Sequence, residues 1–303
     1  MTDDTSTFIP TRIAEAYQQT PEPFFKSTCQ GIGVVVHDCN FDGLNVGYED
    51  GNWRFADFSE YLMEWLPEFA LCTEEYRKIQ GPNARKFLRR AAMRVYKTDE
   101  SKKRGEIGEL ALHALLRELY HSVPAISKVY FKTAVNDTVK GFDAAHIVDN
   151  DGRLELWLGE SKFYTNIHQA ITSVVKELED HSKTDYLKSE FVLIEDKVDS
   201  SWKEANTIHQ LLSQRKSLDS IFNDLRFPVL LTYESPTVQS TSTITREFVD
   251  RLVSELQKHH LDFTNTLNNS PAQRLAVHLF LLPLADKEKL VKTFDEKLRG
   301  LNI

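Results

Sequence analysis

The strand-like segment at residues 154–159 limits the possible folds more than any other part of the chain. It is an apolar run that reads as a strand, and it ends directly in Glu160, Ser161 and Lys162. A run of this kind is typical of a strand buried within a sheet. Side chains two residues apart on a strand lie on the same face. A carboxylate and an ammonium therefore meet at the end of a buried strand.

The segments around this strand predict an α/β fold. Strand-like runs at residues 128–133 and 141–148 precede it, and the Asp151-Gly152 pair forms a hairpin turn just before it. Helical periodicity covers residues 101–120 and 166–181 on either side. The order of helix, three strands and helix, followed by further strands and helices, favours a mixed central sheet covered by helices on both faces.

The first third of the chain has a different character. Aromatic side chains at helical spacing predict a helix that buries an aromatic stripe, formed by Phe58, Tyr61, Trp65 and Phe69. A basic helix begins at Pro82, and its apolar positions leave the arginines on the opposite side. We therefore divide the chain into an N-terminal α+β region at residues 1–100 and a second domain at residues 101–303.

The acid-x-Lys triplet needs support from its surroundings before it can indicate a site. The chain has four such triplets, close to the chance expectation for a sequence this rich in charged residues, so the spacing alone carries no information. Glu160 and Lys162 differ from the other three pairs because they close a buried strand. Asp143 begins the neighbouring strand and reaches the same edge of the sheet across the hairpin. Three charged groups therefore converge at one edge.

The helix before these strands supplies a further carboxylate. Glu106 and Glu109 lie three residues apart and hence on adjacent faces of this helix. Glu109 aligns with Leu112 and Leu116, whereas Glu106 aligns with a more polar stripe, so we expect Glu109 to point inward. Gly108 has no side chain and lets the helix approach the sheet closely. Glu106 remains the alternative, since it is equally available in the sequence.

Converging carboxylates indicate a cation site. They repel one another unless a cation neutralises them, and hard oxygen ligands suit Mg²⁺ or Mn²⁺. Such a cluster can bind a phosphodiester and deliver a metal-activated water, while the Lys162 ammonium stabilises the developing charge. The alternative interpretation is structural: Asp143, Glu160 and Lys162 would be salt-bridged charges at strand ends, and Glu109 an exposed helical residue.

The charge distribution allows nucleic-acid binding at one place. The formal net charge of −8 excludes a protein that coats DNA by bulk electrostatics. Residues 81–104, however, carry a net charge of +7, which leaves −15 on the remainder. The candidate DNA-contacting side chains of this segment are Arg85, Arg89, Arg90, Lys102, Lys103 and Arg104. DNA is the favoured contact of this basic surface, and an acidic partner protein or solvent are the alternatives.

Composition also limits the setting of the protein. Three cysteines, Cys29, Cys39 and Cys72, are too few and too scattered for a disulfide framework, and we expect reduced thiols. The longest apolar stretch is far shorter than the roughly 20 residues that cross a bilayer, so we expect no membrane contact. The N-terminal residues lack a basic region followed by an apolar run. These features predict a cytoplasmic protein.

The candidate site residues also carry a family resemblance. Residues 105–109 on a helix, 141–143 at a strand and 159–162 at the end of the next strand resemble the PD-(D/E)xK nuclease superfamily, which has the restriction-endonuclease-like fold. More narrowly, residues 140–143 and 156–164 resemble HamA, the nuclease subunit family of the Hachiman anti-phage defence system. The match is clearest over residues 105–181. Phe142 stands where the superfamily pattern has proline.

The resemblance implies a fold, an activity and a partner. It implies an α-β-β-β-α-β core within residues 101–303, Mg²⁺-dependent DNA hydrolysis in which Mn²⁺ can substitute, and the superfamily 2 helicase HamB as partner. Asp143 and Glu160 would be metal ligands, Lys162 the catalytic lysine and Glu109 the helix carboxylate. A non-catalytic module of the same fold, which binds DNA or docks a helicase, is the alternative function.

Overall fold

The structure is a computed structural model, and most of the chain is described in it. The described residues are 20–25, 33–96, 105–126, 141–196, 198, 205–212 and 224–301. The predicted strand at residues 128–133 and the basic residues Lys102, Lys103 and Arg104 lie outside these ranges.

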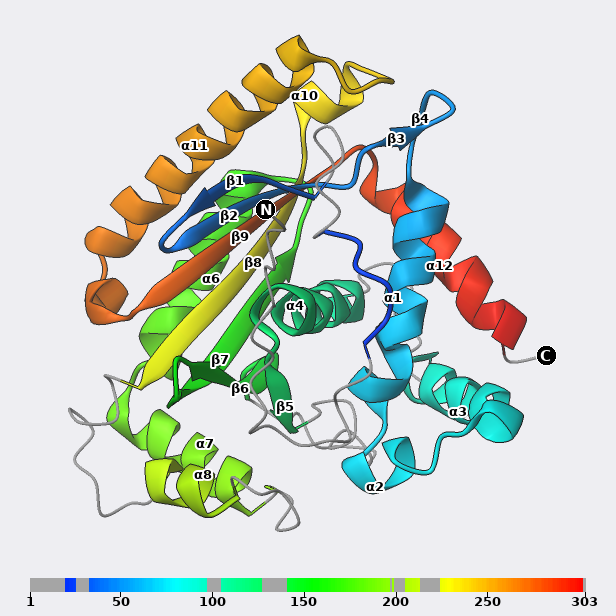
Figure 1. The fold of residues 1–303 in the computed structure, drawn as a ribbon. Helices are drawn as coiled ribbons and strands as arrows, with labels where there is room; N and C mark the ends of the chain where they lie inside the picture. Colours follow the sequence, from blue (N-terminus) through cyan, green and yellow to red (C-terminus); the bar gives the residue numbers. More distant parts are fainter. Residues whose placement is uncertain are drawn as a thin grey trace, which may run out of the picture.

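A mixed sheet forms the centre of the molecule (Figure 1). Within the described residues it has seven strands in the order β1-β2-β9-β8-β7-β6-β5. The strands are β1 (Gly33–Asp38), β2 (Phe41–Asn45), β5 (Val123–Ile126), β6 (Ala144–Asn150), β7 (Arg153–Phe163), β8 (Leu225–Glu234) and β9 (Val277–Leu284). The four central strands, from β2 to β7, are parallel, whereas β1 on one side and β6 and β5 on the other are antiparallel to their neighbours. A separate two-stranded ribbon joins β3 (Tyr48–Glu49) to β4 (Asn52–Trp53).

Helices cover both faces of this sheet. Those between β4 and β5 are α1 (Phe55–Ala70), α2 (Thr73–Tyr76), the 3₁₀ turn η2 (Gly81–Asn83), α3 (Ala84–Tyr96) and α4 (Gly105–Tyr120). The later ones are α6 (Ile167–His181), α7 (Thr184–Glu195), α8 (Ala205–Leu212), α10 (Pro236–Gln239), α11 (Arg246–Asn268), η3 (Pro271–Arg274) and α12 (Lys287–Leu301). The predicted α/β class, with a mixed sheet between helices, is therefore confirmed.

Strand β7 is the buried strand that the sequence predicts. Residues 155–161 are all buried, and β6 and β8 flank the strand on its two sides. The hairpin turn before it is confirmed, because Asp151 and Gly152 both have positive φ values, 52° and 88°. This register places Gly159 opposite Ala144 and Glu160 beside Val229. Glu160 and Lys162 therefore lie on β7, two strands from the outer strand β5, and Asp143 lies just before β6, the strand between them.

The two faces of the sheet are covered by different helices. Tyr120 of α4 donates a hydrogen bond to Asp42 Oδ2 of β2 (2.6 Å). A Cβ at the next residue, Gly43, would lie 2.8 Å from Leu256 of α11. Successive side chains on a strand point to opposite faces, so α4 and α11 lie on opposite sides. Helix α6 packs beside α11, and Figure 1 shows α4 in front of the sheet and α6 behind it.

The N-terminal region shares this sheet with the rest of the chain. Strand β2 pairs in parallel with β9, so residues 41–43 lie beside residues 279–281. The aromatic stripe of α1 is buried as predicted, and α1 packs on α3, α4 and α12. The division of the chain at residue 100 stays a prediction. No helix among the described residues is long and apolar enough to span a bilayer.

A buried ion network fixes α4 between the sheet and α1. Arg117 Nε donates to Glu68 Oε1 of α1 (2.6 Å), and each of these side chains is 2% exposed. His113 Nε2 lies 3.2 Å from the same oxygen, and its Nδ1 lies 3.2 Å from His146 Nε2 of β6. Burial opposes the charge of Glu68, yet Arg117 and His113 hold its pKa below the ordinary value. The more polar stripe of α4 is therefore buried as deeply as its apolar stripe.

Glu68→Gln should destabilise the protein strongly, because it leaves the Arg117 charge buried without its carboxylate partner. We expect a loss of about 3–5 kcal/mol in the free energy of unfolding, measured by urea denaturation. Glu60→Gln on the same helix is the matched control: Glu60 pairs with Lys297 at the surface, and its loss should cost less than about 1 kcal/mol. Equal losses in the two variants would contradict this account of the network.

Candidate functional site

Glu160 and Lys162 share the face of β7 that α6 covers. The Glu160 side chain is 2% exposed and that of Lys162 is 13% exposed. Glu160 Oε2 lies 4.0 Å from Lys162 Nζ, at the limit of an ion pair. The structure therefore confirms that a carboxylate and an ammonium meet at the end of a buried strand. A buried carboxylate needs hydrogen-bond donors as well as a nearby charge, and α6 supplies one.

His181, the last residue of α6, contacts Glu160. The two side chains lie 2.7 Å apart between His181 Nδ1 and Glu160 Oε1, with Nδ1 as the donor because the partner is a carboxylate. The His181 ring stacks on Tyr186 at 4.2 Å and meets the Phe142 ring edge-on at 5.0 Å. Burial lowers the pKa of His181, although Glu177 and nearby carboxylates oppose that shift. Burial therefore favours the neutral form of the His181 imidazole.

Glu177, one helical turn before His181, forms an ion pair with Lys162. The contact joins Glu177 Oε2 to Lys162 Nζ. Burial opposes the charge of Lys162, but Glu160 and Glu177 together outweigh it and raise the pKa of the ammonium above its ordinary value. Lys162 therefore remains a cation at neutral pH, held between carboxylates from a strand and from a helix.

Asp143 joins the group from the start of β6. Its Oδ2 accepts hydrogen bonds from the backbone N–H of Ser161 (2.9 Å) and from Ser161 Oγ (3.0 Å). Its own N–H donates to the Gly159 carbonyl (2.8 Å), which extends the β6–β7 ladder. Asp143 is also among the carboxylates that raise the pKa of Lys162. Asp143 therefore lies at the same end of β7 as Glu160 and Lys162, bonded to the serine between them, and the joining of the three groups in one site stays a prediction.

Helix α4 approaches the other face of the same strand end. A Cβ at Gly108 would lie 3.3 Å from Ser161 Oγ and 3.1 Å from Phe163 Cβ, which confirms the predicted close approach. The turn that carries Glu109 therefore lies beside the serine that binds Asp143. Glu109 is partly exposed, with Oε2 buried, and Glu106 is partly exposed one turn earlier. The choice of Glu109 over Glu106 stays a prediction.

Three side chains near the triplet, two carboxylates and one imidazole, were not among the site residues predicted from the sequence. Glu177 and His181 come from α6, and Glu190 comes from α7. Glu190 is 5% exposed, and its Oε2 would lie 3.2 Å from a Cβ at Gly141. The spacing of Glu177 and His181, four residues apart on the helix after the triplet, is a signal that the sequence does contain. Glu190 offers no comparable signal.

The donor chemistry fits a hard divalent cation, although its ligands are not assembled. Asp143 and Glu160 present carboxylate oxygens at adjoining strand ends, which is the ligand type that Mg²⁺ and Mn²⁺ prefer. In the parts of the chain that the structure describes, no three His, Cys, Asp or Glu side chains are grouped closely enough to hold a metal ion. The metal-ligand roles of Asp143, Glu160 and Glu109 stay predictions.

The basic helix α3 lies away from this strand end. It packs on α1 and α12, and its apolar face is buried as predicted. Arg90 and Arg94 bind Glu75 (2.8 and 2.7 Å), whereas Arg85 and Arg89 are exposed. A surface hollow of about 440 Å³ is lined by Lys86, Arg89, Arg90, Met93 and Arg94. The predicted basic surface therefore exists on α3 but does not adjoin Glu160.

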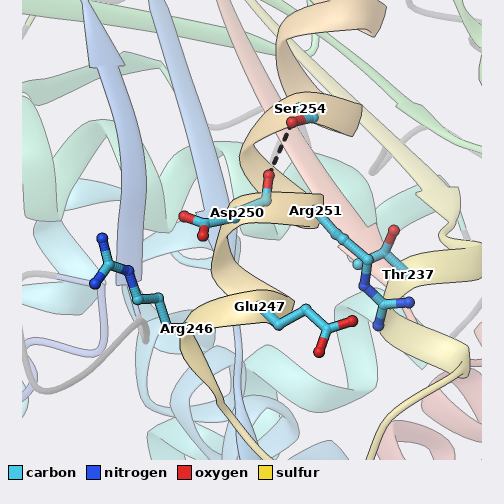
Figure 2. Close-up of a pocket in the computed structure, with 6 residues that line it drawn as sticks. All are labelled: Thr237, Arg246, Glu247, Asp250, Arg251 and Ser254. Atoms are coloured by element: carbon cyan, nitrogen blue, oxygen red, sulfur yellow. Dashed lines mark hydrogen bonds between the residues drawn. The ribbon is translucent and has the colours of Figure 1, made fainter.

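A larger surface hollow lies on α10 and α11, and its lining residues do not form a group of carboxylates and lysine like the one at the end of β7. Figure 2 shows its lining residues on α10 and the first turns of α11, which are Thr237, Arg246, Glu247, Asp250, Arg251 and Ser254. Its volume is about 700 Å³, and the two arginines are balanced by two carboxylates. Ser254 Oγ donates to the backbone carbonyl of Asp250 (2.9 Å), an ordinary bond within a helix. The strand end of β7 therefore remains the candidate site.

Comparisons with known proteins cover most of the chain. A family model described as HamA matches residues 22–298, a range that includes each residue of the candidate site. Anti-bacteriophage protein A of Escherichia coli (strain K12) is 25% identical over 263 residues. This alignment covers 84% of the chain and 47% of that relative, so the chain spans about half of the relative's length.

Gly108→Val should push α4 away from β7, because its added carbons meet Phe163 and Ser161. We expect the free energy of unfolding to fall by about 1–3 kcal/mol, measured by urea denaturation. Gly105→Val, in the first turn of the same helix, is the matched control, since a Cβ there has no heavy atom within 4 Å among the described residues. A Gly108 variant as stable as the Gly105 variant would show that the close approach is not required.

Proposed function

The chain belongs to the HamA family, and on that premise we propose that it is a metal-dependent DNA nuclease that acts in bacterial anti-phage defence. One observation carries the proposal: where β6 begins, Asp143 is bonded to Ser161, the residue between Glu160 and Lys162. The name of the E. coli relative, an anti-bacteriophage protein, supports the biological role. The reaction we infer is hydrolysis of a phosphodiester bond.

Each residue of the group has a distinct part in this reaction. Asp143 and Glu160 would hold the cation through their carboxylates. When bound, Mg²⁺ or Mn²⁺ polarises the phosphodiester and lowers the pKa of a water molecule. Lys162 remains protonated because the surrounding carboxylates raise the pKa of its ammonium. The positive charge of the Lys162 ammonium, fixed in this position, stabilises the negative charge that develops on the phosphate.

The order of elements supports the superfamily that the resemblance implies. From α4 to β8 the described chain runs through a helix, three antiparallel strands, the helices α6, α7 and α8, and a strand parallel to β7. We propose that this segment is the restriction-endonuclease-like PD-(D/E)xK core. Phe142, which stands in place of the usual proline, is 5% exposed and packs on the His181 ring. The departure therefore leaves a residue that supports the group.

A helicase partner is part of the proposal. The superfamily 2 helicase HamB is the partner that the family resemblance implies. Because the chain spans 47% of the E. coli relative, the activity, substrates and partners of the whole relative are not consequences of the match. The exposed basic surface of α3 is a candidate contact either for such a partner or for DNA.

A second function is favoured by a specific observation. The Lys162 ammonium is paired with Glu177, and the described residues hold no assembled metal-ligand group. These features are also compatible with a catalytically silent module of the same fold that binds DNA or docks a helicase. The two functions differ in whether the purified protein cuts DNA.

The purified chain should cut plasmid DNA in the presence of Mg²⁺ or Mn²⁺, and EDTA should stop the reaction. Glu160→Ala and Lys162→Ala should each slow cleavage by about a hundredfold or more, because each removes a group that holds the cation or stabilises charge. The rate is measured by conversion of supercoiled plasmid to nicked or linear forms on a gel.

Lys292→Ala, an exposed lysine of α12, is the control and should cut like the wild type. Cleavage by the Glu160 and Lys162 variants at the wild-type rate would show that the assigned site is wrong. DNA binding that survives chelation, without cleavage under any metal condition, would instead support the silent module.

Arg89→Ala tests whether the basic surface of α3 contacts DNA. Removing one phosphate contact should weaken binding equally for different sequences and lower the slope of log affinity against log salt by about one. Binding is measured by fluorescence anisotropy in EDTA, which prevents cleavage. Lys258→Ala on α11 is the matched control, because Lys258 is exposed on another helix. An unchanged slope for Arg89→Ala would assign this surface to a partner protein or to solvent.

A further inference from the structure

Two residues of α6 face the two functional residues of β7 as a complementary set. His181, a hydrogen-bond donor, contacts the Glu160 carboxylate, and Glu177, an anion, contacts the Lys162 ammonium. Each side chain of the acid-x-Lys pair thus meets an α6 group of the kind that binds it. The sequence motif of the strand is matched by a second motif, Glu-x-x-x-His, on the helix.

The spacing of the two motifs explains this match. Side chains two residues apart on a strand are separated by about 6.6 Å along it. Side chains four residues apart on a helix are separated by about 6 Å along its axis and lie on one face. A helix that crosses behind the strand can therefore contact both strand residues at once. Because the strand and the helix are both rigid, the contact between His181 and Glu160 also brings Glu177 close to Lys162.

We propose that His181 and Glu177 are positioning residues of the candidate site. This proposal rests on the proposed nuclease function. His181 orients the Glu160 carboxylate so that it can hold the divalent cation, and Glu177 holds the Lys162 ammonium beside it. Neither residue touches the substrate in this assignment. Both act through the residue that they contact.

The role of His181 follows from the geometry of Glu160. Its Oε1 is hydrogen-bonded to His181 Nδ1 (2.7 Å) and its Oε2 lies 4.0 Å from Lys162 Nζ, so the direction of the carboxylate is set by a contact at each oxygen. The imidazole is itself held by stacking on Tyr186 and by the Phe142 ring. Partners that orient metal-binding side chains contribute about 10–100-fold to metal affinity or activity when they are removed.

The role of Glu177 follows from the length and freedom of the lysine side chain. An ammonium on a flexible four-carbon stem has no fixed direction unless a partner holds it. Glu160 Oε2 is 4.0 Å away, whereas the Glu177 carboxylate is in direct contact with Lys162 Nζ. The Glu177 side chain is 36% exposed, but Oε2, the atom that contacts Lys162, is buried. Helix α6 fixes Glu177 because Val174 and Leu178 are buried against the sheet.

Two substitutions of His181 separate its hydrogen bond from its stacking. His181→Asn keeps a donor at the position of Nδ1 but removes the ring, whereas His181→Phe keeps a ring but removes the donor. We expect His181→Phe to weaken Mn²⁺ binding, measured by isothermal titration calorimetry, by about tenfold or more, and His181→Asn to recover most of that loss. His209→Phe is the control, since His209 Nδ1 also lies near a carboxylate, that of Glu195 (3.8 Å).

Glu177→Ala should produce a different kinetic signature. With Lys162 no longer held, the cleavage rate at saturating Mn²⁺ should fall by about tenfold or more, while Mn²⁺ affinity stays within about threefold of the wild type. Glu179→Ala, two residues along α6, is the matched control and should change neither quantity. Each variant is compared with the wild type for its unfolding temperature, so that a loss of fold is not mistaken for a loss of positioning.

The outcomes distinguish this assignment from the proposed function. A wild type that neither binds Mn²⁺ nor cuts DNA would refute the function and the assignment together. A wild type that does both, with His181→Phe equal to it, would refute the assignment alone. If His181→Asn loses Mn²⁺ affinity and His181→Phe keeps it, the role of His181 is ring stacking and not hydrogen bonding. Faster cleavage by Glu177→Ala would show that Glu177 restrains Lys162 rather than holding it for catalysis.

Discussion

The burial of the Glu160 carboxylate is the constraint on which the rest of the site depends. A carboxylate that is nearly inaccessible to water is costly unless donors and cations surround it. The chain meets this cost with His181 from α6 and with Lys162 from the same strand face, while Asp143 is bonded to the intervening serine. These contacts fix the register of β6 against β7 and the axial position of α6, so the architecture around the site follows from one buried charge.

The sequence predicts the local part of this arrangement well. The apolar run of β7, the Asp151-Gly152 turn and the shared face of Glu160 and Lys162 all depend on neighbouring residues, and all are confirmed. The contribution of α6 was not predictable in the same way, because periodicity locates a helix without giving its rotation against the sheet. The contacts of Glu177 and His181 with the triplet therefore depend on the rotation of α6 against the sheet, which only the structure shows.

Helix α4 illustrates the same limit from another side. Its two stripes differ in polarity, and this difference favours Glu109 over Glu106 as the carboxylate that points inward. Helix α1 packs on the opposite side of α4 and supplies Glu68, so His113 and Arg117 are also buried. That contact joins residues almost 50 positions apart, and no periodicity within α4 reports it. Polarity within a helix therefore indicates exposure only when one side of the helix is uncovered.

The pairing of β2 with β9 has a consequence for synthesis of the chain. Residue 41 lies beside residue 279, so this part of the sheet cannot close until the ribosome has made almost the whole described sequence. Strands β6 and β7 form a hairpin of adjacent residues, and α6 follows directly, so the candidate site can assemble much earlier. Completion of the sheet is therefore a late event in synthesis, and it can follow the assembly of the candidate site.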